Sequence, residues 1–149
     1  MNDTDIAKKS REAMWRNDTA VKDLGMEVEV EGPGAAVSRF EVKEHMVNGH
    51  DICHGGFIFT LADTAFAYAC NTYNRIAVAA SAAIEFVRPG KLGDPLTATA
   101  EEAHRGGRTG VYDVMVRNQD DELIAIFRGR SYATRQPLFE SDTENIENP

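Results

Sequence analysis

The fold is decided by residues 55–73, which read GGFIFTLADTAFAYACNTY. When this segment is wound as a helix, small and large apolar residues fall on every side of it. A helix that is apolar all round is buried rather than mounted on a surface. The segment therefore predicts one long central helix, and the rest of the chain must supply the elements that cover it.

Strand-like runs lie on both sides of this predicted helix. Before it, apolar residues alternate with glutamates over 26–31, a glycine-proline turn follows, and 35–42 returns as the second strand of a hairpin. A short amphipathic helix is expected over 4–17. After the central helix come four more runs, whose spacing predicts antiparallel hairpins: 75–86, 95–103, 110–117 and 123–133.

The order is therefore one helix, two strands, one long apolar helix and four strands. An antiparallel sheet must bury one face against something apolar, and only the segment 55–73 is apolar enough. The sequence predicts an α+β fold in which a curved antiparallel sheet wraps around one long central helix. With 149 residues the chain is long enough for one domain, expected over 1–134, and the acidic segment 135–149 is expected to be a disordered tail.

The composition excludes several classes of function. The formal net charge is −8, and the phosphate backbone of a nucleic acid repels a protein this acidic. No run approaches 18 apolar residues and the first twenty residues hold no apolar leader, so we expect no membrane span and a cytoplasmic location. Cys53 and Cys70 are expected to be reduced thiols, with a single disulfide as the less favoured alternative.

Asp63 is the one formally charged residue between His54 and Arg75. Aspartate is roughly 0.7 kcal/mol worse than alanine inside a helix, and burying an unpaired carboxylate costs several kcal/mol more. Two interpretations follow from this pattern. The carboxylate is satisfied by Thr60, Thr64 or a basic group, or it acts in a site as nucleophile or general base.

The start of the predicted helix is a second candidate feature, because His54, Gly55 and Gly56 precede its first apolar turn. A helix N-terminus offers free N–H groups and a positive dipole end, and glycine lets a substrate oxygen approach them, as in an oxyanion hole. Gly55 and Asp63 lie roughly 12 Å apart along a helix, so one carbonyl cannot contact both in a single chain. If both serve one reaction centre, a two-fold dimer is required.

The segment 48–73, NGHDICHGGFIFTLADTAFAYACNTY, resembles the signature of hotdog-fold thioesterases of the phenylacetic acid degradation type, known as PaaI. The resemblance continues through FVRPG at 86–90, GDPLTATA at 93–100, RTGVYDVMVRNQ at 108–119 and IFRGRS at 126–131, and it covers roughly residues 10–134. It implies a hotdog fold and a homodimer at minimum, often a homotetramer built of two dimers. It also implies no metal and no cofactor other than the coenzyme A of the substrate.

This resemblance implies hydrolysis of acyl-CoA thioesters, with phenylacetyl and hydroxyphenylacetyl groups as the favoured acyl groups. It assigns Asp63 to the family's helix carboxylate and Gly55 to the backbone N–H that polarises the thioester carbonyl. Asn48 and His54 fall on loop residues that orient substrate or water. Thr64, beside the carboxylate, is assigned to placing the water.

Further substrate contacts are expected from basic residues. Arg105 and Arg108 of one turn, together with Arg88, are interpreted as charge-assisted donors to the CoA phosphates, which gives an acidic protein a local anion site. A solvated turn explains the same arginines equally well. Gly56 is assigned to substrate binding because it adjoins the oxyanion donor.

Three other functions remain open. Four potential zinc ligands lie within ten residues, although their spacing is that of no known zinc finger: His45, His50, Cys53 and His54. A hotdog hydroxyacyl-CoA dehydratase pairs a loop histidine with a helix acid, whereas an aspartate beside HGG favours hydrolysis. A non-catalytic acyl-CoA binder would gain more from an apolar residue at position 63.

Three aromatic residues of the helix are interpreted as core or as the lining of an aryl pocket: Phe57, Phe66 and Tyr68.

Overall fold

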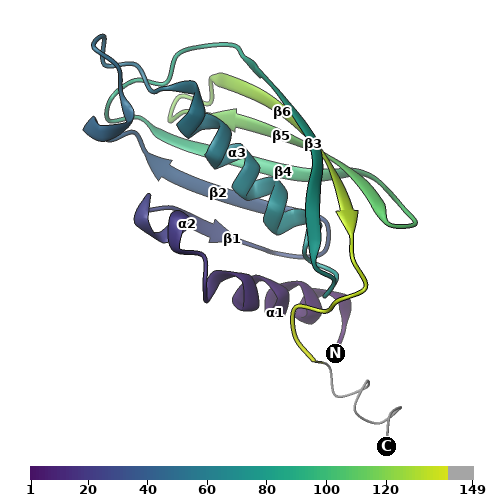
Figure 1. Cartoon of the computed structure of the whole chain (residues 1–149). Coiled ribbons are helices and arrows are strands. Elements are labelled where there is room, and N and C mark those ends of the chain that lie inside the picture. The colour runs from purple at the N-terminus through teal and green to yellow at the C-terminus, as the bar shows by residue number, and fades with distance from the viewer. Residues whose placement is uncertain (141–149) are drawn as a thin grey trace, which may run out of the picture.

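The computed structural model describes residues 1–140, and Figure 1 gives its architecture. Its single sheet is antiparallel, has six strands in the order β1-β2-β4-β5-β6-β3, and curls around one central helix, α3. The predicted arrangement of a curved antiparallel sheet around a central helix is therefore confirmed. The elements are α1 (Asp3–Trp15), α2 (Thr19–Asp23), β1 (Glu27–Glu29), β2 (Ala35–Glu41), η1 (Glu44–Met46), α3 (Gly55–Cys70), β3 (Ala77–Phe86), β4 (Pro95–Gly106), β5 (Thr109–Arg117) and β6 (Leu123–Ala133).

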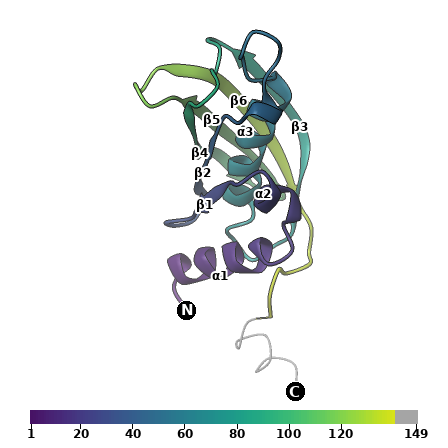
Figure 2. The same cartoon turned by 90° about the vertical axis from the view of Figure 1, so that its left-hand side faces the viewer.

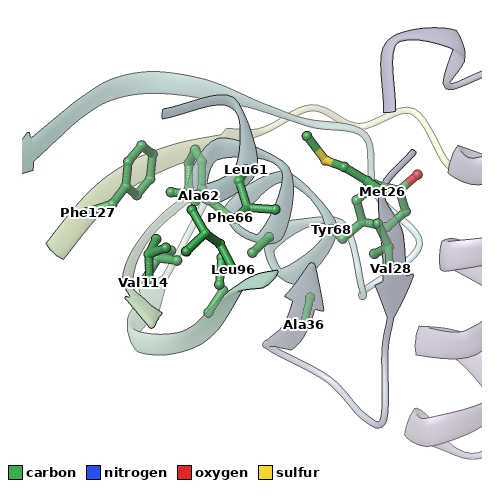
Figure 3. Close-up of a cluster of buried hydrophobic side chains, with 14 of the residues drawn as sticks. Met26, Val28, Ala36, Leu61, Ala62, Phe66, Tyr68, Leu96, Val114 and Phe127 are labelled. Carbon is green, nitrogen blue, oxygen red and sulfur yellow. The ribbon is translucent and has the colours of Figure 1, made fainter. Parts of the chain in front are cut away.

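The core lies between α3 and the concave face of the sheet. Figure 3 shows Leu61 and Phe66 of α3 directed toward Leu96, Val114 and Phe127 of the sheet, and all five side chains are buried. The rings of Phe66 and Phe127 lie 5.7 Å apart between centroids, within the range that aromatic pairs favour. Apolar alternation along the strands thus supplies one wall of the core, and the helix supplies the other.

The sheet does not cover α3 on every side. Gly56, Thr60, Asp63 and Ala67 all keep solvent exposure, and their spacing of four, three and four residues puts them on one side of the helix. We call these four residues the open stripe. The expectation that α3 is buried all round is therefore wrong for a single chain.

Strand β3 is a second uncovered feature. It forms one edge of the sheet, pairs only with β6 within residues 1–140, and exposes both faces along 78–83. Its apolar side chains are unusually accessible, with Val78 52% and Phe86 54% exposed. An unpaired strand edge is a ready template for pairing with another chain, so the open stripe and β3 indicate where a second copy would bind.

Helix α1 crosses the end of the domain between β1 and the loop after α3 (Figure 2). The guanidinium of Arg11 donates to the carbonyl of Val28 on β1, and the backbone N–H of Asn74 donates to Ser10 Oγ. Helix α1 thereby connects the β1 edge of the sheet to the loop that follows α3. Within residues 1–140, no helix is long and apolar enough to cross a bilayer.

The ends of α3 and β4 differ from the predicted ones, and the structure has one additional helix. Helix α3 ends at Cys70 because the side-chain amide of Asn71 bonds to the carbonyls of Ala67 and Ala77 and accepts from Ala77 N–H. Strand β4 continues to Gly106, beyond the expected end near 103. The short helix α2 was not predicted, and no side chain caps its start.

The C-terminal segment also departs from expectation in the part that is described. The N–H of Ile76 donates to the carbonyl of Gln136, and the Asn74 side chain accepts from the N–H groups of Leu138 and Phe139. Residues 136–139 are therefore held against the domain, although disorder was expected from 135. The remainder of that predicted tail, 141–149, lies outside the described residues.

Replacing Gly129 with alanine should destabilise the domain, because the new Cβ would lie 2.7 Å from Cε1 of the buried Phe66 ring. Overpacking of this kind costs about 1–3 kcal/mol of unfolding free energy, which chemical denaturation measures. Gly32→Ala is the control, because no atom lies within 4 Å of its Cβ position. Equal stability of the two variants would contradict close packing of β6 on α3.

Candidate active site

Asp63 lies on the open stripe and is half-buried. Burial raises the pKa of its carboxyl above the ordinary value, and no hydrogen bond or ion pair reaches it from any residue of 1–140. The two threonines considered as partners donate elsewhere: Thr60 to the carbonyl of Gly56 at 2.9 Å and Thr64 to that of Thr60 at 2.7 Å. A half-buried carboxylate without a partner is typical of a functional site.

The N-terminus of α3 supplies free donors. The N–H of Phe57 donates to the carbonyl of His54, but no acceptor within residues 1–140 serves the N–H groups of Gly55 and Gly56. These two groups stand at the positive end of a 16-residue helix. They can stabilise a developing oxyanion, as an oxyanion hole requires.

Asn48 shapes the loop that leads into this helix. Its side-chain oxygen accepts from the N–H groups of His50 and Ile52, and its own N–H donates to the carbonyl of Ile52. Asparagine side chains commonly stabilise turns in this way, by hydrogen-bonding to nearby backbone groups. The NH₂ group of Asn48 has no acceptor within residues 1–140, so it can donate to a bound molecule. His54 follows as the N-cap of α3, with an exposed side chain.

Thr64 adjoins Asp63 in the sequence but faces a different side of α3. It is buried, and its hydroxyl donates to the backbone one turn back along the helix. Adjacent helical residues point about 100° apart, because a turn takes 3.6 residues, so Thr64 is off the open stripe. Within one chain, Thr60 rather than Thr64 shares that stripe with Asp63.

Asp63 and Gly55 remain apart within one chain. Eight residues of α3 separate them, which corresponds to roughly 12 Å at 1.5 Å per residue. Gly56 lies on the same open stripe as Asp63, so both chemical features face the side that the sheet leaves uncovered. A second α3, antiparallel on this side, would bring its first turn to Asp63.

Four arginines line one cavity of about 480 Å³ beyond the C-terminal end of α3: Arg75, Arg105, Arg108 and Arg135. Cys70 also lines this cavity, seven residues beyond Asp63 on the helix. Arg105 stacks on the Tyr73 ring, with 3.5 Å from its Cζ to the ring centroid. Such a concentration of guanidinium groups in an acidic chain forms a local site for an anion.

The structure separates Arg88 from Arg108. Arg88 follows the last residue of β3, whereas Arg108 bonds through its carbonyl to Ala133, which pairs with the first residue of β3. The ten residues of β3 span roughly 33 Å at 3.3 Å per residue. The two arginines therefore cannot contact the same phosphates within one chain.

A second cavity, of about 440 Å³, begins at Gly55 and was not anticipated from the sequence. Its walls are mainly apolar, and they include the Phe86 ring, Val87 and Pro89. The sequence did contain a signal for it, because Phe86 is an aromatic residue at the end of a run of small residues and lies shortly before Arg88-Pro89-Gly90. Cys53 also lines this cavity as a free thiol, and burial raises its pKa to about 11.

The zinc alternative gains no support. Within residues 1–140, no three His, Cys, Asp or Glu side chains gather so that they could hold a metal ion. The ring of His45 instead packs edge-on against Phe57, with 6.2 Å between centroids. Both cysteines are free, as expected.

Within residues 1–140 a curved sheet thus wraps around a helix that carries an acid without a partner and N–H donors without acceptors, which is the arrangement that the resemblance to hotdog-fold thioesterases implies. Residues 50–125 match the family described as the thioesterase superfamily. The chain belongs to this superfamily.

Known relatives agree with this assignment. The chain is 48% identical over 126 residues to the acyl-coenzyme A thioesterase PaaI of Escherichia coli K12, which covers 85% of this chain and 90% of the relative. It is 31% identical to a putative esterase of Archaeoglobus fulgidus, covering 88% and 85% of the two chains. The predicted resemblance to PaaI-type thioesterases is confirmed.

Solved structures give the same result for the fold. The E. coli PaaI protein superposes with a TM-score of 0.88 at 45% identity, covering 91% of this chain and 99% of that one. A hypothetical thioesterase of Streptococcus pneumoniae, solved with coenzyme A, gives 0.71 at 28% identity, with 75% and 90% covered. The hotdog fold predicted from the sequence is thereby confirmed.

The unpartnered Asp63 should cost the folded protein stability at neutral pH. Because its pKa is raised on folding, stability falls as the pH rises from the unfolded-state pKa through the folded-state pKa. Asp63→Asn should therefore raise the Tm at pH 7 by roughly 2–4 °C, and the gain should shrink toward pH 4. Thermal unfolding at both pH values measures this, and a lower Tm for the variant at pH 7 would reveal an ionic partner instead.

Proposed function

We propose that this protein hydrolyses aryl-type acyl-CoA thioesters, with phenylacetyl or hydroxyphenylacetyl as the acyl group, to the free acid and CoA. The observation that carries the proposal is the half-buried carboxylate of Asp63, which has no partner within residues 1–140. The name of the E. coli relative supports the acyl-CoA thioester, and coenzyme A in the S. pneumoniae structure supports the carrier. The aryl group rests on the resemblance to PaaI-type enzymes.

Two chains form each site in this proposal. Antiparallel pairing of β3 with the β3 of a second copy would continue the sheet and cover the exposed strand edge. The same two-fold axis would lay the partner's α3 antiparallel over the open stripe, and so bring a second Gly55 to Asp63. Two equivalent sites result from this isologous contact. A homotetramer built of two such dimers is the assembly that the family resemblance favours.

The chemistry then uses both helices. The thioester oxygen accepts from the N–H groups of Gly55 and Gly56, which stabilise the negative charge as the carbonyl carbon becomes tetrahedral. Asp63 of the other chain either attacks that carbon, giving an anhydride that water hydrolyses, or takes a proton from the attacking water. In both routes the carbon–sulfur bond breaks, and CoA leaves as a thiolate that is then protonated.

Other side chains position the reactants. The free NH₂ group of Asn48 and the exposed ring of His54 are proposed to orient the substrate or water at the helix start. Thr64 is proposed as a positioning residue, since its hydroxyl bonds to the α3 backbone beside Asp63. No metal and no separate cofactor takes part.

Arg88 and Arg108 are proposed to bind the CoA phosphates from different chains. Antiparallel β3 strands would bring the Arg88 end of one chain beside the arginine-lined cavity of the other. Guanidinium groups form charge-assisted hydrogen bonds to phosphate oxygens. The separation of the two arginines within one chain is then consistent with one shared binding site.

Release of free CoA thiol from phenylacetyl-CoA tests the proposal. Wild type should turn over, and Asp63→Asn should lower kcat by roughly 10²–10⁴, since it removes the nucleophile or base while keeping the shape. Asp51→Asn is the matched control, because it makes the same exchange on the exposed loop before α3. No thiol release by wild type, or equal rates for the two variants, would overturn the proposal.

The pH dependence of kcat gives an independent prediction. Asp63 must be ionised in either role, and burial raises its pKa above the ordinary 3.8. Activity should therefore fall as the pH drops, with a midpoint above 3.8, as steady-state rates from pH 4 to 8 would record. A single turnover in ¹⁸O-water bears on the two roles: label in Asp63 indicates attack by the side chain, whereas label only in the product acid favours activated water or an anhydride that water opens at the acyl carbon.

A further inference from the structure

Arg88, proposed to bind a CoA phosphate, is one of the residues that line the apolar cavity beside Gly55, but the apolar part of this cavity has no role in the proposed chemistry. Gly55, whose N–H has no acceptor within residues 1–140, also lines the cavity, and the volume of about 440 Å³ exceeds that of a phenyl ring. Its walls come from the loop before α3, the first turn of α3 and the segment that ends β3. The residues that matter here are Ile52, Ile58, Phe86, Val87 and Pro89.

Phe86 lies directly against the proposed oxyanion donor. A Cβ built on Gly55 would lie 2.8 Å from Cζ of Phe86, so the ring occupies the space that a side chain at Gly55 would fill. The ring is nevertheless 54% exposed, which leaves a face available for contact. The Phe86 ring and the Gly55 N–H therefore lie next to each other, close enough for a thioester bound at this N–H to place one substituent of its carbonyl carbon beside the ring.

The two substituents of that carbon differ in chemistry. The pantetheine arm on the sulfur side carries two amides, which lose hydrogen bonds when they enter an apolar wall. The acyl side of an aryl thioester is apolar, and an aromatic pair gains about 0.5–1.5 kcal/mol beyond area burial. The arginine-lined cavity offers the charged end of CoA a different place to bind.

We propose that the cavity beside Gly55 holds the aryl ring of the acyl group, and that Phe86 selects for this ring by stacking on it. The proposal rests on the proposed thioesterase function and adds a specificity-determining residue to it. The neighbouring Cys53 does not compete with Asp63 for the thioester. Burial raises the pKa of that thiol to about 11, so it stays protonated and unreactive at neutral pH.

The test compares kcat/KM for three thioesters with wild type and Phe86→Ala. They are phenylacetyl-CoA, acetyl-CoA, which lacks the ring, and phenylacetyl-N-acetylcysteamine, which keeps the ring and lacks most of the carrier. The phenylacetyl-CoA to acetyl-CoA ratio should fall at least about tenfold in the variant. The ratio of the two phenylacetyl thioesters should stay within twofold of wild type.

Two further variants test whether a change in these ratios comes from the cavity itself rather than from the loss of any exposed apolar side chain. Met115→Ala removes an exposed apolar side chain from β5, away from β3 and from both cavities, and it should leave both ratios unchanged. Ile52→Ala enlarges the cavity from a wall that does not belong to β3, and it should lower the phenylacetyl-to-acetyl ratio as Phe86→Ala does. Sedimentation of each variant verifies that assembly is retained.

Failure of the aryl-ring assignment and failure of the proposed thioesterase function give different results in these assays. No hydrolysis of any thioester by wild type would remove the proposed function itself. An active wild type whose acyl ratio is unmoved in both Phe86→Ala and Ile52→Ala would overturn the aryl assignment alone. A change confined to the ratio between the two phenylacetyl thioesters would mean that the cavity holds the carrier arm, and would also overturn it.

Discussion

Helix α3 is too apolar to face water, yet the sheet of one chain covers only part of it. The open stripe of Gly56, Thr60, Asp63 and Ala67 stays accessible, and β3 beside it presents an unpaired edge with both faces exposed. Both features cost free energy in an isolated chain, through exposed apolar surface and unpaired backbone groups. The proposed two-fold contact would cover both, so the same constraint that shapes the fold favours assembly.

The candidate catalytic groups lie on the side of α3 that the sheet of one chain leaves uncovered. Asp63 lowers the stability of the fold at neutral pH, because burial raises its pKa and no residue of 1–140 forms an ion pair with it. The N–H groups of Gly55 and Gly56 are likewise left without acceptors within residues 1–140. In the proposed dimer, the acid and the donor pair, which are too far apart on one helix to act on one carbonyl, would form a site because the helix of the second chain runs the other way. Cavities of different character, one apolar and one lined by arginines, then adjoin the reaction centre.

Much of the fold and the candidate acid could be predicted from local patterns in the sequence. Periodicity predicted α3, the order of strands and the curved sheet, and the isolated charge at Asp63 identified the candidate acid. What the sequence could not predict depends on contacts between distant segments. The Asn71 amide ends α3 by bonding to Ala77, and Asn74 fixes 136–139. The cavity at Phe86 forms only when β3 ends beside the helix start, and the same length of β3 separates two arginines that the sequence had grouped.

The most direct test of the shared site mixes two inactive chains. Asp63→Asn removes the acid, and Gly55→Pro removes the N–H donor at the first helical position, where the backbone accepts proline. The proline Cβ also displaces the exposed Phe86 ring of the same chain, but the intact site of a mixed dimer takes Gly55 and Phe86 from the other chain. Equal mixing with exchange of chains should restore about a quarter of wild-type activity, because half the dimers are mixed and each has one intact site of two. No recovery, with mixed dimers demonstrated by mass spectrometry, would contradict a site built from two chains.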